Sequence, residues 1–268
     1  MRKLLGSLLM IGTLGTAMPA RADESALDKI KQAGTMKVCV AQISPESYKD
    51  SRSGEWRGVM IDLVKELADW MKVKPEWVEV TYDIAVLSLK RGDCDFFGGS
   101  IVYNAPRAME INYIKPLWAK GSNVVLPNAS DKFKTMSDLN RSGVTLAVLA
   151  GSSENEVAKR LFPEATLLAL KATQPAQILD SVKRGDADGG FLPALTIKWW
   201  LAVPENRAWG KLGFPDGDVA NAPNGWAVRY GDPGWKNFLD SFAEWAVASQ
   251  LVNRLYAHYL ELSNPFTK

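Results

Sequence analysis

Apolar and polar residues follow two different periods in the first half of the chain. Short apolar runs at residues 36–42, 78–81 and 94–98 are typical of buried strands. Residues 58–71 instead place apolar side chains three and four positions apart, which predicts a helix with one buried face. A shorter helix is predicted at residues 85–90. This order of strand, helix, strand, helix and strand favours a parallel sheet in an α/β unit.

A second unit of the same plan follows. Its predicted strands are residues 144–149, 167–170 and 190–192, and its predicted helices are residues 153–161, 176–183 and 194–201. Thr173 is the expected N-cap of the middle helix, with Pro175 near its first turn. Two more helices are expected at the end, one starting at Asp232-Pro233 and one over residues 250–262.

Two further apolar strands connect these units. Residues 123–127 lie between the units, and the similar run at 225–229 returns after the second. The pattern predicts two α/β lobes joined by two crossing strands. Because open parallel sheets bind ligands beyond the carboxyl ends of their strands, we expect a hinged clamp with its ligand in the cleft.

The N-terminus has the pattern of a cleavable export signal. Arg2 and Lys3 precede an uncharged run at residues 4–18, and a small-x-small pattern ends at Ala22. The uncharged run is shorter than the ~20 residues of a transmembrane helix, so an uncleaved anchor is the weaker alternative. We expect residues 1–22 to be removed. We assign residues 23–122 and 228–268 to a first lobe and residues 123–227, including the crossing strands, to a second.

Composition and charge exclude several classes of function. The 268 residues carry 32 basic and 30 acidic side chains, which gives no electrostatic reason to expect nucleic acid. The one histidine, His258, lies in a helix-like stretch near the C-terminus. Catalytic triads and His-rich zinc sites need histidines in the right places. We therefore expect no catalytic residues, no metal and no cofactor, and we interpret His258 as structural or exposed.

The two cysteines lie in strand-like contexts. Cys39 and Cys94 would meet an oxidising compartment after export. A bond between them would close a loop of about 55 positions and stabilise the fold by roughly 4 kcal/mol in the chain-entropy model. Two buried thiols are the alternative, and the sequence leaves both open.

Several short motifs occur together in an order that resembles a known family. They are Leu27 to Gly34 with its closing glycine, Gly58-Val59-Met60-Ile61-Asp62-Leu63, Leu89-Lys90-Arg91-Gly92-Asp93-Cys94-Asp95, Arg107, the segment Tyr113 to Trp118, and Gly185-Asp186-Ala187-Asp188. The chain resembles the bacterial extracellular solute-binding proteins of family 3, periplasmic amino-acid-binding components of ABC importers. The resemblance implies the type II two-lobed fold with a two-strand hinge, a periplasmic monomer, and delivery of a solute to an ABC transporter permease.

The resemblance also implies the ligand-binding residues. The family arginine that holds the ligand carboxylate corresponds to Arg107, and a guanidinium can donate two parallel hydrogen bonds to such a group. Gly151, Ser152 and Ser153 would bind the same carboxylate from the second lobe, since a helix N-terminus suits an anion. The implied set is completed by Gly99 and Ser100 in the first lobe and by Leu149, at the end of the strand before Gly151. A surface salt bridge for Arg107 and an ordinary serine N-cap are the structural alternatives.

Two further residues that we assign to the ligand site, Tyr48 and Pro193, depart from the family pattern. The aspartate that pairs with the ligand α-ammonium in amino-acid binders is replaced by Pro193, which offers neither a carboxylate nor an N–H. The usual stacking aromatic of the first lobe is missing or displaced, with Tyr48 as a substitute. Either the ligand is a carboxylate without an α-ammonium, or another acid such as Glu46 or Asp83 replaces the lost partner, or the protein no longer serves an importer.

Three classes of function follow, of which solute binding is the leading one. The cysteine positions also resemble those of periplasmic accessory proteins of quinoprotein dehydrogenases, which would associate with an enzyme and bind no small molecule. A dehydratase on the same fold, like the cyclohexadienyl dehydratases, would need a cleft carboxylic acid with a raised pKa. Glu154 is the nearest acid to the serines, and we interpret it as an exposed first-turn residue. We therefore expect a binding protein and not an enzyme.

Overall fold

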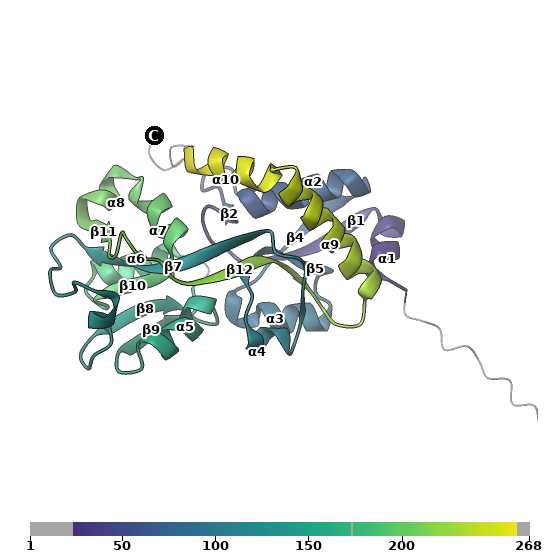
Figure 1. The fold of residues 1–268 in the computed structure, drawn as a ribbon. Coiled ribbons are helices and arrows are strands. Elements are labelled where there is room, and N and C mark those ends of the chain that lie inside the picture. The colour runs from purple at the N-terminus through teal and green to yellow at the C-terminus, as the bar shows by residue number, and fades with distance from the viewer. Residues whose placement is uncertain (1–23, 173, 262–268) are drawn as a thin grey trace, which may run out of the picture.

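Two lobes lie side by side in the computed structural model, which describes residues 24–172 and 174–261 (Figure 1). The strands β7 (Trp118–Pro127) and β12 (Val219–Val228) are ten residues long and run from one lobe into the other. The predicted signal peptide, residues 1–22, and the predicted N-cap Thr173 lie outside the described residues. Pro175 occupies the N-cap position of the helix that follows.

One continuous sheet passes through both lobes, in the order β4-β1-β5-β12-β7-β10-β8-β9. Its remaining strands are β1 (Thr35–Val40), β4 (Lys74–Glu79), β5 (Phe96–Val102), β8 (Thr145–Leu149), β9 (Thr166–Leu170) and β10 (Gly189–Pro193), with β6 (Asn112–Tyr113) beside β12 and β11 (Gly210–Leu212) beside β7. The strands β4, β1 and β5 of the first lobe pair in parallel, as do β10, β8 and β9 of the second. The crossing strands β12 and β7 pair antiparallel with each other and with their neighbours β5 and β10. The predicted parallel α/β units with two crossing strands are therefore confirmed.

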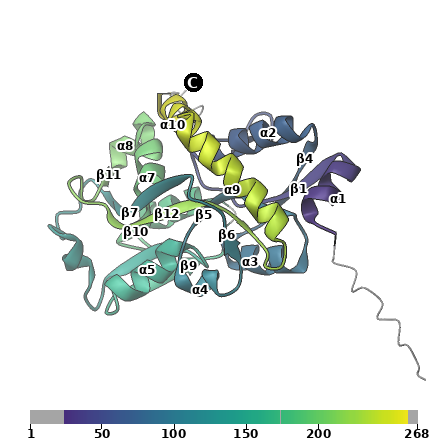
Figure 2. The same cartoon turned by 45° about the vertical axis from the view of Figure 1, so that its right-hand side comes forward.

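Helices cover both faces of the sheet (Figure 2). The first lobe holds α1 (Ala26–Ala33), α2 (Val59–Met71), α3 (Tyr82–Arg91), α4 (Ala105–Ala108), α9 (Pro233–Ala248) and α10 (Leu251–Glu261), with the short hairpin β2 (Tyr48–Lys49) and β3 (Trp56–Arg57). The second lobe holds η1 (Met136–Leu139), α5 (Ser153–Leu161), α6 (Ala176–Lys183), α7 (Ala194–Leu201) and α8 (Pro204–Trp209). Because side chains alternate along β5, Phe96 packs in the cluster that contains α2 and α9, and Phe97 packs in the cluster that contains α3.

Helix positions agree more closely with the sequence prediction than strand positions do. The helices α5, α6 and α7 have the predicted bounds, because their apolar spacing and flanking residues are local signals. The crossing strands start earlier than predicted, at Trp118 and Val219, because their polar first halves pair with each other. The strand predicted at 78–81 is β4, four residues earlier, where it pairs along its whole length with β1.

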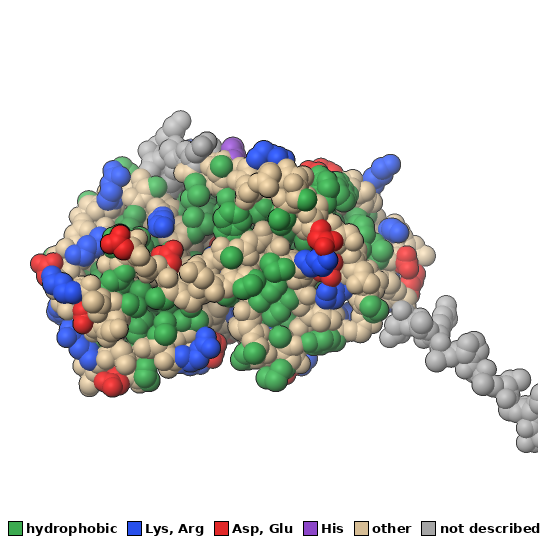
Figure 3. All heavy atoms as spheres, viewed as in Figure 1, with side chains coloured by type: hydrophobic (Ala, Val, Ile, Leu, Met, Phe, Trp, Pro, Cys, Tyr) green, Lys and Arg blue, Asp and Glu red, His purple; other side chains and the backbone are tan. Residues whose placement is uncertain are grey.

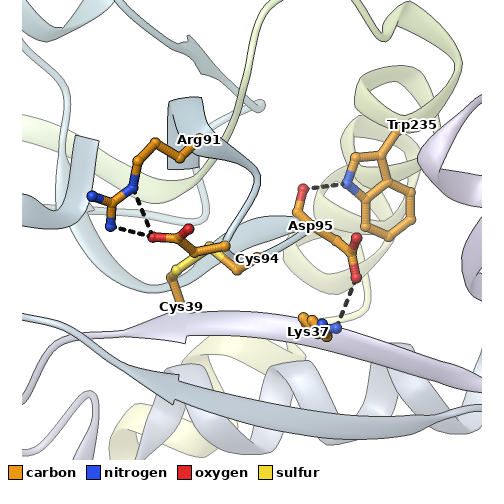
Figure 4. The surroundings of a disulfide bond; sticks show 7 residues. Lys37, Cys39, Arg91, Cys94, Asp95 and Trp235 are labelled. Carbon is orange, nitrogen blue, oxygen red and sulfur yellow. Dashed lines mark hydrogen bonds and ion pairs between the residues drawn. A yellow bond between two sulfur atoms is a disulfide. The ribbon is translucent and has the colours of Figure 1, made fainter. Parts of the chain in front are cut away.

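A disulfide joins β1 to the bend just before β5 (Figure 4). Cys39 and Cys94 form an S–S bond of 2.03 Å with Cα atoms 5.6 Å apart, and both residues are buried. Next to it, the Asp95 carboxylate accepts a hydrogen bond from the Lys37 N–H, and the Asp95 carbonyl accepts one from the Trp235 indole. The disulfide thus links β1 to the segment before β5, and the Trp235 hydrogen bond links that segment to α9. Of the two alternatives for the cysteines, the disulfide is the correct one.

Removal of this disulfide is expected to lower the free energy of unfolding by about 4 kcal/mol, because it spans 55 positions of the chain. The variant Cys39→Ala/Cys94→Ala should therefore unfold at a lower urea concentration than the oxidised protein, which equilibrium denaturation followed by tryptophan fluorescence would measure. Adding reductant should shift the wild-type curve in the same direction and leave the variant curve unchanged. Superimposable curves for oxidised protein and variant would show that the bond adds no stability.

The visible surface carries charges of both signs. In Figure 3, basic and acidic side chains are interspersed on the visible face, with hydrophobic side chains over the middle of both lobes. His258 is exposed on α10. None of the described helices has the length and apolar character needed to cross a membrane. Within residues 24–172 and 174–261, no group of three or more His, Cys, Asp or Glu side chains is placed to hold a metal ion.

Candidate functional site

Arg107 lines a narrow cavity between the two lobes. The cavity measures about 10 Å³, close to the space one water molecule needs. Its walls come from both lobes: Ile43, Tyr82, Ser100, Val102, Arg107 and Lys120 on one side, and Leu149, Ser152, Ser153, Glu154 and Pro193 on the other. Six of the nine predicted ligand-binding residues are brought together here. The lobes are closed, so a solute would enter only after they separate.

The Arg107 side chain joins the lobes. Arg107 lies on α4, whose first turn is capped by the Asn104 side chain accepting from the Arg107 N–H at 3.0 Å. Its guanidinium donates to the Val102 carbonyl at 3.2 Å in its own lobe and to the Gly151 carbonyl at 2.5 Å in the other. A guanidinium has five N–H donors, so donors remain for a ligand carboxylate.

The opposite wall is the start of α5. The strand β8 ends at Leu149, and the Ser152 hydroxyl caps α5 by accepting from the Asn155 N–H at 3.1 Å. Gly151 has φ +72°, and a Cβ there would lie 2.5 Å from the Asp83 Cα of α3. Only glycine combines this backbone conformation with so close an approach of the two lobes. Gly151 is therefore a residue of the closure contact.

A buried ion pair lies beside Arg107. The Lys120 ammonium donates to both carboxylate oxygens of Glu46 at 3.1 Å and to the Ser100 hydroxyl at 2.8 Å. The Lys120 and Glu46 side chains are 6% and 0% exposed. Glu46 also accepts from Ser100, Tyr256 and Asn224. Lys120 was not identified as a site residue from the sequence. The one signal that could have indicated it is the isolated position of this lysine in an otherwise uncharged stretch between the two lobes.

The position of Glu46 follows from the first turn of α2. The Val59 and Met60 N–H groups at the start of α2 donate to the carbonyls of Pro45 and Glu46. Gly58 has φ +123°, and a Cβ there would lie 2.4 Å from the Glu46 carbonyl oxygen. The glycine of the Gly-Val-Met-Ile-Asp-Leu motif thus lets the loop that carries Glu46 pack directly on α2.

Tyr82, not Tyr48, is the aromatic side chain of the Arg107 cavity. Tyr82 begins α3, and its hydroxyl donates to the Ser100 carbonyl at 2.8 Å. Burial raises the pKa of Tyr82 well above its ordinary value, and the carboxylates of Glu46 and Glu154 add to this shift. The hydroxyl is therefore a permanent donor at neutral pH. Its place at a helix start, after a strand without a motif, explains why the sequence did not indicate it.

Tyr48 lies at a second contact between the lobes. Its ring packs 5.4 Å from the ring of Trp199 on α7, and both line a cavity of about 490 Å³. The Thr196 hydroxyl donates to the Ser44 carbonyl at 2.7 Å nearby. Gly99, also predicted to contact the ligand, is not among the residues lining the Arg107 cavity, and a Cβ there would face Phe97.

Glu154 does not have the expected environment. It was interpreted as an exposed first-turn residue, but its relative exposure is 5% and it lines the Arg107 cavity. The Ser122 and Ser153 hydroxyls donate to its carboxylate at 3.1 and 2.9 Å. The exposed-residue interpretation is wrong because α5 begins at the cleft and lobe closure covers its first turn.

Pro193 ends β10 at the same cavity. It pairs in register with Ser122 of β7 and is fully enclosed by the two lobes. A proline side chain can offer a ligand only apolar contact here. Asp83, named above as a replacement acid, is exposed and accepts from the Thr81 hydroxyl outside the cavity.

Sequence comparisons identify relatives over most of the chain. The lysine/arginine/ornithine-binding periplasmic protein of Escherichia coli strain K12 is 30% identical over 162 residues, 60% of this chain and 58% of that protein. The aligned part thus spans little more than half of that relative. The cyclohexadienyl dehydratase of Pseudomonas aeruginosa is 24% identical over 267 residues, 98% of this chain and 96% of that protein.

Known structures share the fold. The crystal structure of the ancestral amino acid-binding protein AncCDT-1, described as a precursor of cyclohexadienyl dehydratase, matches with a TM-score of 0.79 and 26% identity. The match covers 88% of this chain and 100% of that one. The sequence profile of the bacterial extracellular solute-binding proteins, family 3, matches residues 36–262. With the two-lobed fold and its inter-lobe cavity, this match shows that the chain belongs to the bacterial extracellular solute-binding proteins of family 3.

Proposed function

We propose that the protein captures a small carboxylate-bearing solute, an amino acid or a similar molecule, between its lobes and delivers it to an ABC transporter permease. The observation that carries this proposal is the hydrogen bond from Arg107 in one lobe to the Gly151 carbonyl, just before the N-cap of α5, in the other. A carboxylate placed between them would accept from the guanidinium and from the groups at the helix start. Binding would then favour closure, because each lobe supplies part of the site.

Ligand entry requires an exchange of contacts. When the lobes open, two hydrogen bonds between them break: the bond from Arg107 to the Gly151 carbonyl and the bond from the Thr196 hydroxyl to the Ser44 carbonyl. The ligand carboxylate then replaces the Gly151 carbonyl at the guanidinium, and the lobes close on the solute. We assign residues 23–122 and 228–268 to the first lobe and residues 123–227 to the second, with β7 and β12 as the hinge.

We infer that the protein works in the periplasm after removal of residues 1–22. The names of the lysine/arginine/ornithine-binding and histidine-binding relatives, both periplasmic proteins, support this location and a transport function. The side chains around Arg107 can bind a solute through charge and hydrogen bonds alone, so this binding needs no cofactor. We therefore propose a binding function, with an ABC permease as the partner of the closed form.

A thermal-shift screen of the mature, ligand-stripped protein tests this function. The probes are α-amino acids, their analogues without the amine, betaines and dicarboxylates. A ligand at a hundredfold excess over its dissociation constant should stabilise the protein by about 2.7 kcal/mol. We expect this shift for at least one carboxylate and not for the corresponding primary amide. If no carboxylate shifts the transition, the proposed function fails, and a pull-down for a dehydrogenase partner would test the accessory function.

A dehydratase activity is the second candidate, favoured by one observation. The dehydratase relative aligns over 96% of its length, and the cleft of this chain holds the buried acids Glu46 and Glu154. Incubation with prephenate or arogenate, followed by absorbance of the aromatic product, distinguishes the two functions. We expect no product, since Glu46 is already paired with Lys120. Turnover abolished by Glu154→Gln would establish the enzyme instead.

A further inference from the structure

The Arg107 cavity contains more than one charged group, and only some of them are neutralised within the protein. Glu46 and Lys120 neutralise each other at 3.1 Å. The Lys120 ammonium places its three donors on the two Glu46 oxygens and the Ser100 hydroxyl, so its hydrogen bonds are complete. The pair is therefore occupied internally and leaves a ligand little to bind there.

Glu154 differs from Glu46 in forming no salt bridge within the described part of the chain, although Arg107 and Lys120 line the same cavity. Its carboxylate is buried and accepts from two neutral hydroxyls, those of Ser122 and Ser153. Among residues 24–172 and 174–261, no Lys, Arg or His nitrogen lies within ion-pair distance of it. A carboxylate offers about four acceptor positions, so two remain. Burying a charge without an ionic partner is costly, which makes Glu154 a site for a cation from outside the chain.

The fold holds this carboxylate at the ligand cavity. Glu154 is the second residue of α5, directly after Ser152 and Ser153, and this helix start lies at the cavity. Ser122, which donates to Glu154, pairs in register with Pro193. The carboxylate therefore reaches the part of the cleft where Pro193 itself offers no charge.

There is also room for a ligand group next to Glu154. Besides lining the Arg107 cavity, Glu154 borders an adjoining cavity of about 170 Å³. Lys120, Ser153 and Val102 border both spaces. A ligand held at Arg107 by its carboxylate can therefore direct a second group toward Glu154 once the lobes have opened and closed around it.

We propose that Glu154 binds the cationic group of the ligand, so that the site selects a molecule with both a carboxylate and an ammonium. This inference rests on the proposed function, because it assumes that Arg107 holds the carboxylate. It assigns the specificity to the first turn of α5 and decides between the alternatives that Pro193 left open: Glu154, rather than Glu46 or Asp83, is the acid that replaces the lost partner.

Isothermal titration of wild type and Glu154→Gln tests the proposal. The probes are the twenty L-amino acids, each compared with its acid lacking the α-amine, such as L-alanine with propionate and L-leucine with 4-methylpentanoate. We expect wild type to bind one amino acid at least tenfold more tightly than its amine-free partner. Glu154→Gln, which keeps the side-chain shape, should lower that affinity at least tenfold and leave the amine-free acid unaffected. Glu164→Gln, an exposed acid of the same lobe, is the control and should change neither.

The outcomes separate this inference from the proposed function. Unchanged amino-acid preference in Glu154→Gln, with carboxylate binding that still depends on Arg107, overturns the role of Glu154 alone. A wild-type protein that binds the amine-free acid more tightly than the amino acid also overturns the role of Glu154. A wild type that binds neither member of any pair overturns the role of Glu154, and it overturns the proposed function as well if the betaines and dicarboxylates of the thermal-shift screen also fail to bind. Thermal unfolding of the unliganded variants verifies that each is folded, so that lost affinity is not lost structure.

Discussion

Arg107→Ala should lower the affinity for the carboxylate ligand about a hundredfold or more, the largest effect we expect at the site. Each hydrogen bond to a charged group contributes roughly 1.5–3 kcal/mol, and the guanidinium can donate two to one carboxylate. The fold should remain intact, because Arg107 is partly exposed and its guanidinium donates to neutral groups, the Val102 and Gly151 carbonyls and the Tyr113 hydroxyl. Isothermal titration with the best ligand of the screen measures the affinity, and thermal unfolding measures the stability.

Two further arginine variants serve as controls for this expected loss of affinity. Arg107→Lys keeps the charge but loses the planar pair of donors, so we expect an affinity between those of wild type and Arg107→Ala. Arg184→Ala removes an exposed arginine that pairs with Asp186, and its affinity should equal that of wild type. If Arg107→Ala binds the ligand as wild type does, the carboxylate lies elsewhere and the site assignment is wrong.

The largest effect on stability is expected from Lys120→Met. This change leaves the Glu46 carboxylate fully buried without its cation, which typically costs about 3–5 kcal/mol. The double variant Glu46→Gln/Lys120→Met removes both charges and keeps a group that can bond to Ser100 and Asn224. We therefore expect it to regain most of the lost free energy of unfolding. Equilibrium urea denaturation of the unliganded proteins measures all three values.

An exposed ion pair provides the control for this effect. Lys159 and Glu156 on α5 pair at 2.7 Å with side chains 54% and 47% exposed. Lys159→Met should change the free energy of unfolding by less than about 1 kcal/mol, because water screens the charges of an exposed pair. Equal losses in Lys120→Met and in the double variant would show that packing of the lysine chain, and not the pairing of charges, stabilises the cleft.

The closed cleft was only partly predictable, and the two glutamates show why. Glu154 follows two serines at a helix start, a pattern that usually places a glutamate in solvent. Glu46 lies in a loop without a regular period. Whether a residue such as Glu46 is buried depends on segments more than fifty positions away in the chain, as the bonds from Ser100, Lys120 and Asn224 to Glu46 illustrate. No local pattern contains that information.

The sequence by itself determined the two α/β units, the crossing strands, the family and the place of Arg107, because apolar period, helix caps and motif order are local properties. The pairing of Cys39 with Cys94 and the burial of Glu154 were decided only by the tertiary structure. Both depend on contacts between distant segments, and burial in a cleft is a property of two surfaces together. The ligand specificity that we propose for Glu154 likewise depends on the tertiary structure, because it requires the burial of this side chain in the cleft.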